Sequence, residues 1–155
     1  MDFRIEALPV APFAPLFDLD ELELAARGVV RRIADTRPGF PCRVSLRDAE
    51  PGEAVLLLNY EHLPVAGPYR SRHAIYVREH AQEYVPERNE IPEMLRIRLL
   101  SLRAFDRAGL MIDAELVDGA ASEPVIRRML GNPLVEFLHL HSAKPGCYAA
   151  RAVRA

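Results

Sequence analysis

The stretch Ala54-Val55-Leu56-Leu57-Leu58-Asn59-Tyr60, near the middle of the chain, decides the fold. Its apolar residues follow one another almost without interruption, which is typical of a strand that is covered on both faces. The uninterrupted part, Ala54–Leu58, is the longest apolar run in the sequence. It is far shorter than the roughly 20 residues that a membrane helix needs. The sequence therefore predicts a buried strand here and no transmembrane segment.

Further strands are indicated on both sides of this run by alternating or apolar segments bounded by turn residues. Two helices are indicated by end signals around an apolar stripe. The first helix covers about Leu19–Arg27, and the second begins near Ser122 and ends at Gly131. The expected strands are residues 3–7, Val29–Ala34, Cys42–Leu46, His73–Glu79, Ile97–Phe105, Leu110–Val117, Leu134–His141 and Cys147–Val153. We therefore expect an α+β fold, a single domain over residues 1–155 with a largely antiparallel or mixed β-sheet and two helices.

Length and composition exclude several classes of protein. The chain has 155 residues, of which 50% are hydrophobic and 27% charged, and 20 basic against 22 acidic residues leave a formal charge of −2. These values exclude wholesale disorder and a strongly basic nucleic-acid binder. The start of the chain, Met1–Glu6, lacks the basic flank and apolar stretch of a signal peptide, so a cytoplasmic location is expected. Both cysteines, Cys42 and Cys147, are then expected to be free thiols.

The first polar segment with potential chemistry is Tyr69-Arg70-Ser71-Arg72-His73, which joins a long loop to an apolar strand. Functional groups are often presented at such junctions. Arg70 and Arg72 are candidate contacts for a carboxylate or phosphate, with surface placement as the alternative. His73 shares a strand face with apolar residues, so it is either a hydrogen-bonded core histidine or a site residue.

The second polar segment contains His139-Leu140-His141, followed after a turn by Cys147-Tyr148. Alternation along a strand places both imidazoles on one face, about 6.5 to 7 Å apart. A five-residue turn would place Cys147 opposite His141, and a four-residue turn would place Tyr148 there instead. Zinc sites need three or four ligands with supporting residues, and no acidic residue falls on this face nearby. Metal binding by His139 and His141 with Cys147 or His73 therefore stays an alternative, and no metal ligand is assigned.

A family resemblance rests on the polar segments already described and on two others. The segments are Pro38–Arg43, Leu57–His62, Pro68–Ile75, His139–His141 and Pro145–Arg151, and in the second of them Glu61 and His62 could supply a carboxylate and an imidazole to the same rim. Together they resemble the bacterial domain-of-unknown-function 1203 family, over about Val29 to Arg154. The resemblance implies a small single-domain bacterial protein and brings no activity, cofactor or catalytic residue with it.

Three functions follow as hypotheses. The first is a site for a small anionic ligand, with His73, His139 and His141 in catalytic roles and Tyr69, Arg70, Arg72 and Cys147 as ligand-binding residues. Whether this site is enzymatic, and with what cofactor, stays open. The second is a non-catalytic homodimeric interaction module, and the third is a histidine-rich metal-binding protein. No phosphate-binding loop, dinucleotide motif or nucleophile elbow supports another activity, and neither nucleic acid nor a membrane is expected as a partner.

Overall fold

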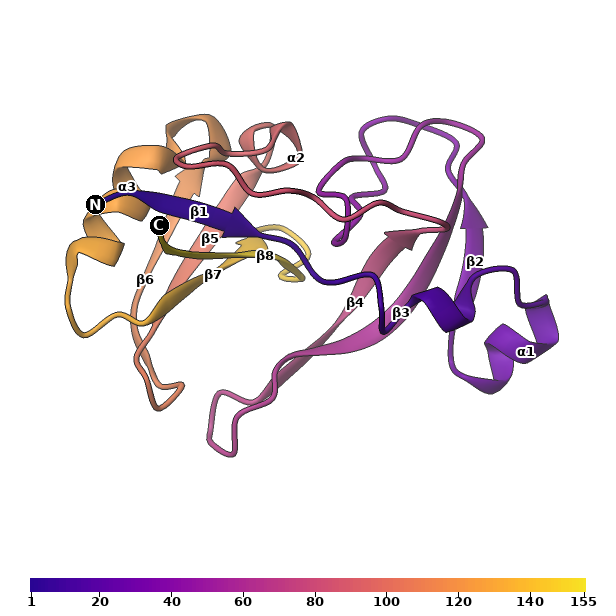
Figure 1. Cartoon of the computed structure of the whole chain (residues 1–155), viewed down its shortest axis with the longest axis horizontal. Helices are drawn as coiled ribbons and strands as arrows, with labels where there is room; N and C mark the ends of the chain where they lie inside the picture. Colours follow the sequence, from indigo (N-terminus) through magenta and orange to yellow (C-terminus); the bar gives the residue numbers. More distant parts are fainter.

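Two antiparallel sheets lie side by side in the computed structural model, which describes all 155 residues (Figure 1). The larger sheet has five strands in the order β1-β8-β7-β5-β6. These strands are β1 (Phe3–Glu6), β8 (Tyr148–Arg154), β7 (Phe137–Ser142), β5 (Leu99–Phe105) and β6 (Met111–Asp118). Consecutive pairs β5–β6 and β7–β8 are hairpins, as the turn residues between them predict. The expected α+β class with antiparallel strands is confirmed.

The smaller sheet has the order β2-β3-β4, so the apolar run Ala54–Leu58 lies in its central strand. Its strands are β2 (Val30–Ile33), β3 (Ala54–Leu63) and β4 (Ser71–Arg78). The strand predicted over Cys42–Leu46 is wrong, although Cys42, Val44 and Leu46 are buried as expected. The Leu46 N–H donates to the Cys42 carbonyl at 3.0 Å, and Leu46 has a φ of 51°. The segment therefore turns back on itself, with a conformation that no strand allows.

Three helices accompany the sheets. They are α1 (Glu21–Ala26), α2 (Glu93–Arg96) and α3 (Ser122–Gly131), with 3₁₀ turns η1 at Ala14–Leu16 and η2 at Gly119–Ala121. Helix α3 packs its buried residues Ile126, Met129 and Leu130 into the core of the five-stranded sheet. The single turn α2 directly follows Pro92 and was not among the expected helices.

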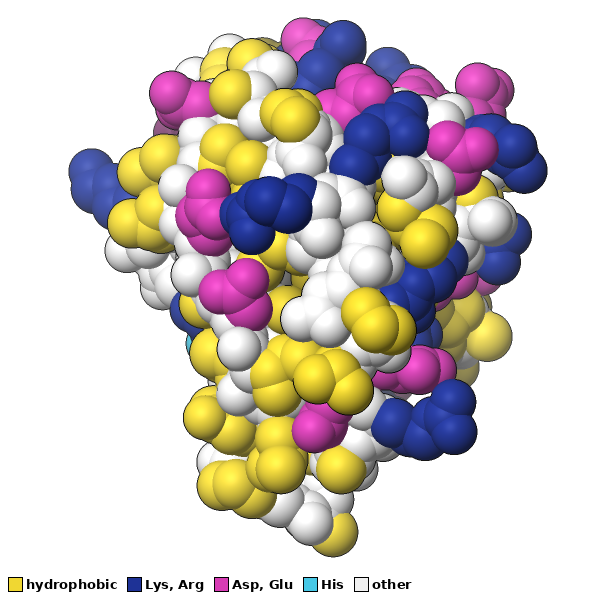
Figure 2. All heavy atoms as spheres, turned by 90° about the vertical axis from the view of Figure 1, so that its left-hand side faces the viewer, with side chains coloured by type: hydrophobic (Ala, Val, Ile, Leu, Met, Phe, Trp, Pro, Cys, Tyr) yellow, Lys and Arg dark blue, Asp and Glu magenta, His cyan; other side chains and the backbone are white.

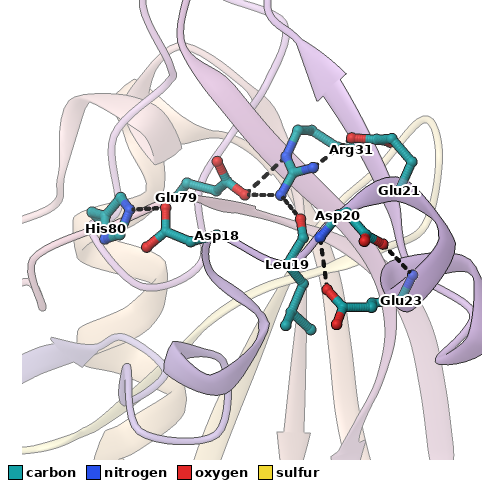
Figure 3. Close-up of polar contacts among 8 residues, drawn as sticks. All are labelled: Asp18, Leu19, Asp20, Glu21, Glu23, Arg31, Glu79 and His80. Atoms are coloured by element: carbon teal, nitrogen blue, oxygen red, sulfur yellow. Dashed lines mark hydrogen bonds and ion pairs between the residues drawn. The ribbon is translucent and has the colours of Figure 1, made fainter.

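Polar contacts fix the first helix to the smaller sheet (Figure 3). Asp20 accepts from the Glu23 N–H at 2.8 Å while the Glu23 carboxylate accepts from the Asp20 N–H at 2.9 Å, which is a capping box. Arg31 on β2 donates to Glu79 and to the Leu19 carbonyl, both at 2.6 Å. A separate contact joins His80 to Asp18 at 2.9 Å. The helix therefore begins at Glu21, two residues after the expected start at Leu19.

Two segments run between the sheets and hold them together. The chain after β1 crosses from the larger sheet toward α1, and the chain after β4 returns to α2 (Figure 1). In the first segment Phe13 is buried in the core of the smaller sheet. In the second segment the Asn89 N–H donates to the Phe3 carbonyl at 2.8 Å. Tyr148 of β8 also belongs to the core of the smaller sheet, so the β7–β8 hairpin lies at the junction.

The outer face of the larger sheet carries mixed charge. Figure 2 shows basic and acidic side chains interspersed over its upper part and apolar side chains gathered toward its lower end, where the β3–β4 and β5–β6 turns lie. Those two turns touch, because a methyl group on Gly109 would come within 2.9 Å of Val65. Almost no histidine surface is visible on this face. No helix of the chain is both long and apolar enough to span a bilayer.

Candidate functional site

Four of the five histidines meet at the junction of the two sheets. His62 near the end of β3 and His73 on β4 come from the smaller sheet, and His139 and His141 on β7 come from the larger one. The His62 ring lies with its centroid 4.8 Å from that of His73, 5.3 Å from that of His139 and 5.1 Å from that of His141. His62 therefore occupies the centre of the cluster, and we refer to these four side chains as the histidine cluster.

The two histidines of β7 point away from the aliphatic core. Leu138 and Leu140 face that core beneath α3, so alternation turns His139 and His141 toward the smaller sheet. They are only 3% and 1% exposed, and their ring centroids are 6.2 Å apart. Both lie on one face, as the spacing predicts.

The length of the β7–β8 turn decides which residue of β8 lies opposite His141. His141 pairs with Tyr148, because the turn leaves Ser142 opposite Cys147, whose carbonyl accepts from the Ser142 N–H at 3.0 Å. The register then shifts between Leu140 and His141, so that Leu140 pairs with Ala150. The pairing of His141 with Tyr148 is the one expected for a four-residue turn, and it brings the Tyr148 phenol to the histidines. The Tyr148 ring stacks on His62 with 4.8 Å between centroids and 9° between planes. Tyr148 thus forms one wall of the histidine cluster.

Burial keeps the imidazoles neutral. Desolvation, reinforced by the neighbouring histidines, lowers the pKa of His139 to about 2 and that of His62 to about 4. Desolvation also lowers the pKa of His141 to about 3 and depresses that of His73. The guanidinium of Arg103 adds to each of these shifts. All four rings are therefore uncharged at neutral pH, and each keeps a nitrogen lone pair.

The hydrogen bonds define where those lone pairs lie. Nδ1 of His141 is 2.9 Å from the Gly146 carbonyl, which can only accept, so Nδ1 carries the proton. Nε2 of His141 is then a lone-pair acceptor, and it is buried without any partner. Nε2 of His62 is 2.7 Å from Nδ1 of His73, and Nδ1 of His62 is 3.3 Å from Nδ1 of His139. Three histidines, His62, His139 and His141, offer ring nitrogens within 4.8 Å of one another.

The other ligand-binding candidates lie outside the histidine cluster. Arg70 and Arg72 are exposed and pair with the Glu61 carboxylate at 3.3 and 3.5 Å. Arg72 and His73 are adjacent on β4, so their side chains point to opposite faces. Tyr69 is 37% exposed and contacts the edge of Phe105. The structure therefore does not bring these three residues to the imidazoles.

Cys147 forms no hydrogen bond with the histidines, although it lines one pocket together with His73. Its Sγ accepts from Nη2 of Arg43 at 3.0 Å, on the side of the β7–β8 turn that faces the smaller sheet. Arg43 is 1% exposed and was not a predicted site residue. Nothing in its local sequence distinguishes it from 18 other arginines, so only the fold identifies it.

Glu61 and His62, which were expected at the same rim, have side chains that point to different places in the structure. The strand continues to Leu63, three residues beyond the predicted end, with a register shift between Glu61 and Leu63. His62 turns into the cluster while Glu61 faces the exposed arginines. The sequence feature that could have identified His62 is its place just after the Ala54–Tyr60 segment, within reach of the same strand.

These features define a small α+β protein in which two antiparallel sheets enclose an all-histidine cluster, without a carboxylate, at their junction. The family described as "Protein of unknown function (DUF1203)" matches residues 39–154, and the chain belongs to this family. The matched range contains all four histidines of the cluster. No curated protein and no solved structure matches the chain.

Proposed function

We propose that the protein binds one divalent transition-metal ion through Nδ1 of His62, Nδ1 of His139 and Nε2 of His141. The observation that carries this proposal is the buried, unpartnered Nε2 of His141. A buried polar atom without a hydrogen bond costs about 1–3 kcal/mol, so such atoms are rare unless a bound group satisfies them. A metal ion is the partner that a lone pair among neutral imidazoles accepts best.

The spacing of the nitrogens supports the same ligand set. Two nitrogens bound 2.0–2.1 Å from a tetrahedral ion lie about 3.3–3.4 Å apart. Nδ1 of His62 and Nδ1 of His139 are separated by 3.3 Å. One ring nitrogen from each of the three histidines lies within 4.8 Å of the other two, so small ring rotations would complete the site.

Supporting hydrogen bonds are present for two of the three ligands. Metal-binding histidines usually donate their second ring N–H to a carbonyl or another acceptor, which fixes the ring and exposes the other nitrogen. The Gly146 carbonyl serves His141 in this way at 2.9 Å. For His62, Nδ1 becomes a ligand when its Nε2–H donates to Nδ1 of His73 at 2.7 Å. His73 is therefore a positioning residue and not a ligand.

The donor set favours particular metals. Imidazole suits zinc, copper, nickel and iron, whereas magnesium and calcium require oxygen ligands that the cluster lacks. Arg103 is close enough to depress the histidine pKa values and has no carboxylate partner, so it opposes a bare cation. An anion such as hydroxide in the fourth coordination position would offset that repulsion. Three protein ligands with one open position is the arrangement of catalytic zinc sites.

Titration of chelator-treated protein with Co²⁺ and Zn²⁺ tests this proposal. Wild type should bind one equivalent of Zn²⁺ by calorimetry and develop the visible absorption of four-coordinate Co²⁺. His141→Gln and His139→Gln should abolish both signals, and His73→Gln should weaken binding about 10- to 100-fold. His80→Gln is the matched control, because His80 is exposed and bonds to Asp18 far from the cluster.

Two results would overturn the assignment. One is wild-type protein that takes up no ion at micromolar concentration. The other is a His141→Gln variant, folded by circular dichroism, that binds Zn²⁺ as tightly as His80→Gln. Thermal unfolding gives an independent check, since an ion at 100 times its Kd should stabilise the wild type by about 2.7 kcal/mol.

A further inference from the structure

A pocket of about 840 Å³ lies beside the histidine cluster, between the two sheets. The smaller sheet contributes one wall through β3 and β4. The start of β5 and the β7–β8 turn of the larger sheet contribute the other. Its lining contains three cationic side chains, Arg43, Arg98 and Lys144, and no carboxylate. The remaining wall includes apolar residues such as Leu57 and Leu99.

Arg43 is the unusual group in this pocket. It is 1% exposed, and a guanidinium cannot escape burial by losing its proton. Nε donates to the Tyr148 carbonyl at 2.8 Å, Nη1 donates to the Pro41 carbonyl, and Nη2 donates to Cys147 Sγ at 3.0 Å. None of these acceptors is a carboxylate. The buried charge therefore has no carboxylate counter-ion, and two of its five N–H donors stay free.

Arg98 and Lys144 differ in whether a carboxylate already neutralises their positive charge. Both Nη atoms of Arg98 donate to the Asp48 carboxylate, at 2.9 and 2.5 Å, so this charge is compensated. Lys144 is exposed on the β7–β8 turn and forms no ion pair. The uncompensated positive charge of the pocket therefore comes from Arg43 and Lys144.

We propose that this pocket binds a small carboxylate with an apolar body, its carboxylate held by Arg43 and Lys144 next to the Cys147 thiol. Two free N–H groups and one ammonium match the two oxygens of a carboxylate, whereas a phosphate dianion would need more donors. The apolar body would lie against Leu57 and Leu99. This proposal does not depend on a metal ion, although His73 lines the pocket and bonds to His62 at 2.7 Å.

Cys147 supplies a direct test, because iodoacetate and iodoacetamide differ mainly in the charge that the pocket would recognise. In both reactions sulfur forms a bond to the CH₂ carbon, iodide leaves with the electron pair, and the thiol proton passes to solvent. Cys42 is fully buried, so Cys147 is the accessible thiol. The measurement is the ratio of the iodoacetate rate to the iodoacetamide rate in chelator-treated protein, compared with the same ratio for glutathione.

Wild type should exceed the glutathione ratio by about tenfold or more, since one charge-assisted hydrogen bond supplies a preference of that size. The iodoacetate rate should also saturate with concentration, and benzoate should slow it more than acetate does. Lys144→Gln should lower the ratio severalfold and leave the iodoacetamide rate unchanged. Arg107→Gln is the matched control, because Arg107 is 92% exposed in the β5–β6 turn, away from the pocket lining.

Arg43→Met should remove the preference entirely. If that variant does not fold, Lys144→Gln against Arg107→Gln decides the question alone. A wild-type ratio equal to that of glutathione would overturn the proposal. So would a preference that Lys144→Gln and Arg107→Gln retain equally. Since no metal is present in these reactions, either outcome leaves the metal-binding proposal to its own experiment.

Discussion

Mild acid should destabilise the metal-free protein through two buried histidines. His139 and His141 are 3% and 1% exposed, and their pKa values are lowered to about 2 and about 3. In the unfolded chain a histidine titrates near 6.5. Between about pH 6.5 and pH 3, His139 and His141 are protonated in the unfolded chain and neutral in the folded protein. The unfolded state therefore binds two more protons than the folded state. The free energy of unfolding therefore falls as the pH drops below 6.5, and it levels off only near the folded-state pKa values.

The size of this effect follows from the same pKa values. Each proton that only the unfolded state binds contributes about 1.4 kcal/mol per pH unit once the unfolded histidine is fully titrated. For two histidines this amounts to about 2 kcal/mol between pH 6.5 and 5.5, and about 3 kcal/mol more by pH 4.5. A domain whose total stability is about 5–15 kcal/mol would lose a large part of it in this range.

Urea denaturation of chelator-treated protein at half-unit steps from pH 7.5 to 5.5 measures the loss. This window lies above the titration of the carboxylates. Glu53, for example, has a pKa lowered by its hydrogen bonds from Arg78, so it affects stability only at lower pH. The variant His139→Gln/His141→Gln should lose the part of the slope that these two residues supply and keep a smaller slope from His62, whose pKa desolvation lowers to about 4. A wild-type free energy that changes by less than about 0.5 kcal/mol, or an equal slope in the variant, would refute the reasoning.

Two packing predictions follow. Gly119→Ala should lower the free energy of unfolding by about 2 kcal/mol or more, because its methyl group would come within 1.8 Å of the Leu95 carbonyl oxygen. Gly131→Ala is its control, since nothing lies within 4 Å there, and equal denaturation midpoints would contradict the prediction. Asp48→Asn should cost about 3 kcal/mol or more in chemical denaturation, because a 4% exposed carboxylate side chain accepts two hydrogen bonds from Arg98. A cost below about 1 kcal/mol would show that this pair behaves as a surface ion pair.

Local patterns were enough to predict most of the elements and one half of the histidine cluster. Alternation along residues 137–142 placed His139 and His141 on one face, and the structure has them there. The helix ending at Gly131 and the hairpin around Asp106–Gly109 follow from end signals and turn residues that act over a few positions. Such features depend on neighbours in the sequence, so one chain suffices to find them.

The rest of the cluster depends on strand pairing over long distances. Nothing in the sequence shows that β7 lies against the sheet of β3 and β4, so the meeting of His62 and His73 with the other two histidines could not be derived. Single-residue bulges also change which residues lie opposite one another, and the sequence pattern does not show where they occur. The bulge after Leu140 places Tyr148 opposite His141, where the register of Leu138–Leu140 would place Ala149. The partner of Arg70 and Arg72 was likewise hidden, because Glu61 lies on the neighbouring strand.

The position of the histidine cluster between the sheets has a consequence for the whole chain. His62 and His139 are 77 positions apart in the sequence, and each belongs to a different sheet. An ion held by both would close a loop of that length, a restraint that is costly in entropy for an unfolded chain. On unfolding only the local His139-x-His141 pair could stay on the ion. Metal-loaded protein should therefore resist partial opening between its halves, and a protease would find fewer sites in it than in the metal-free form.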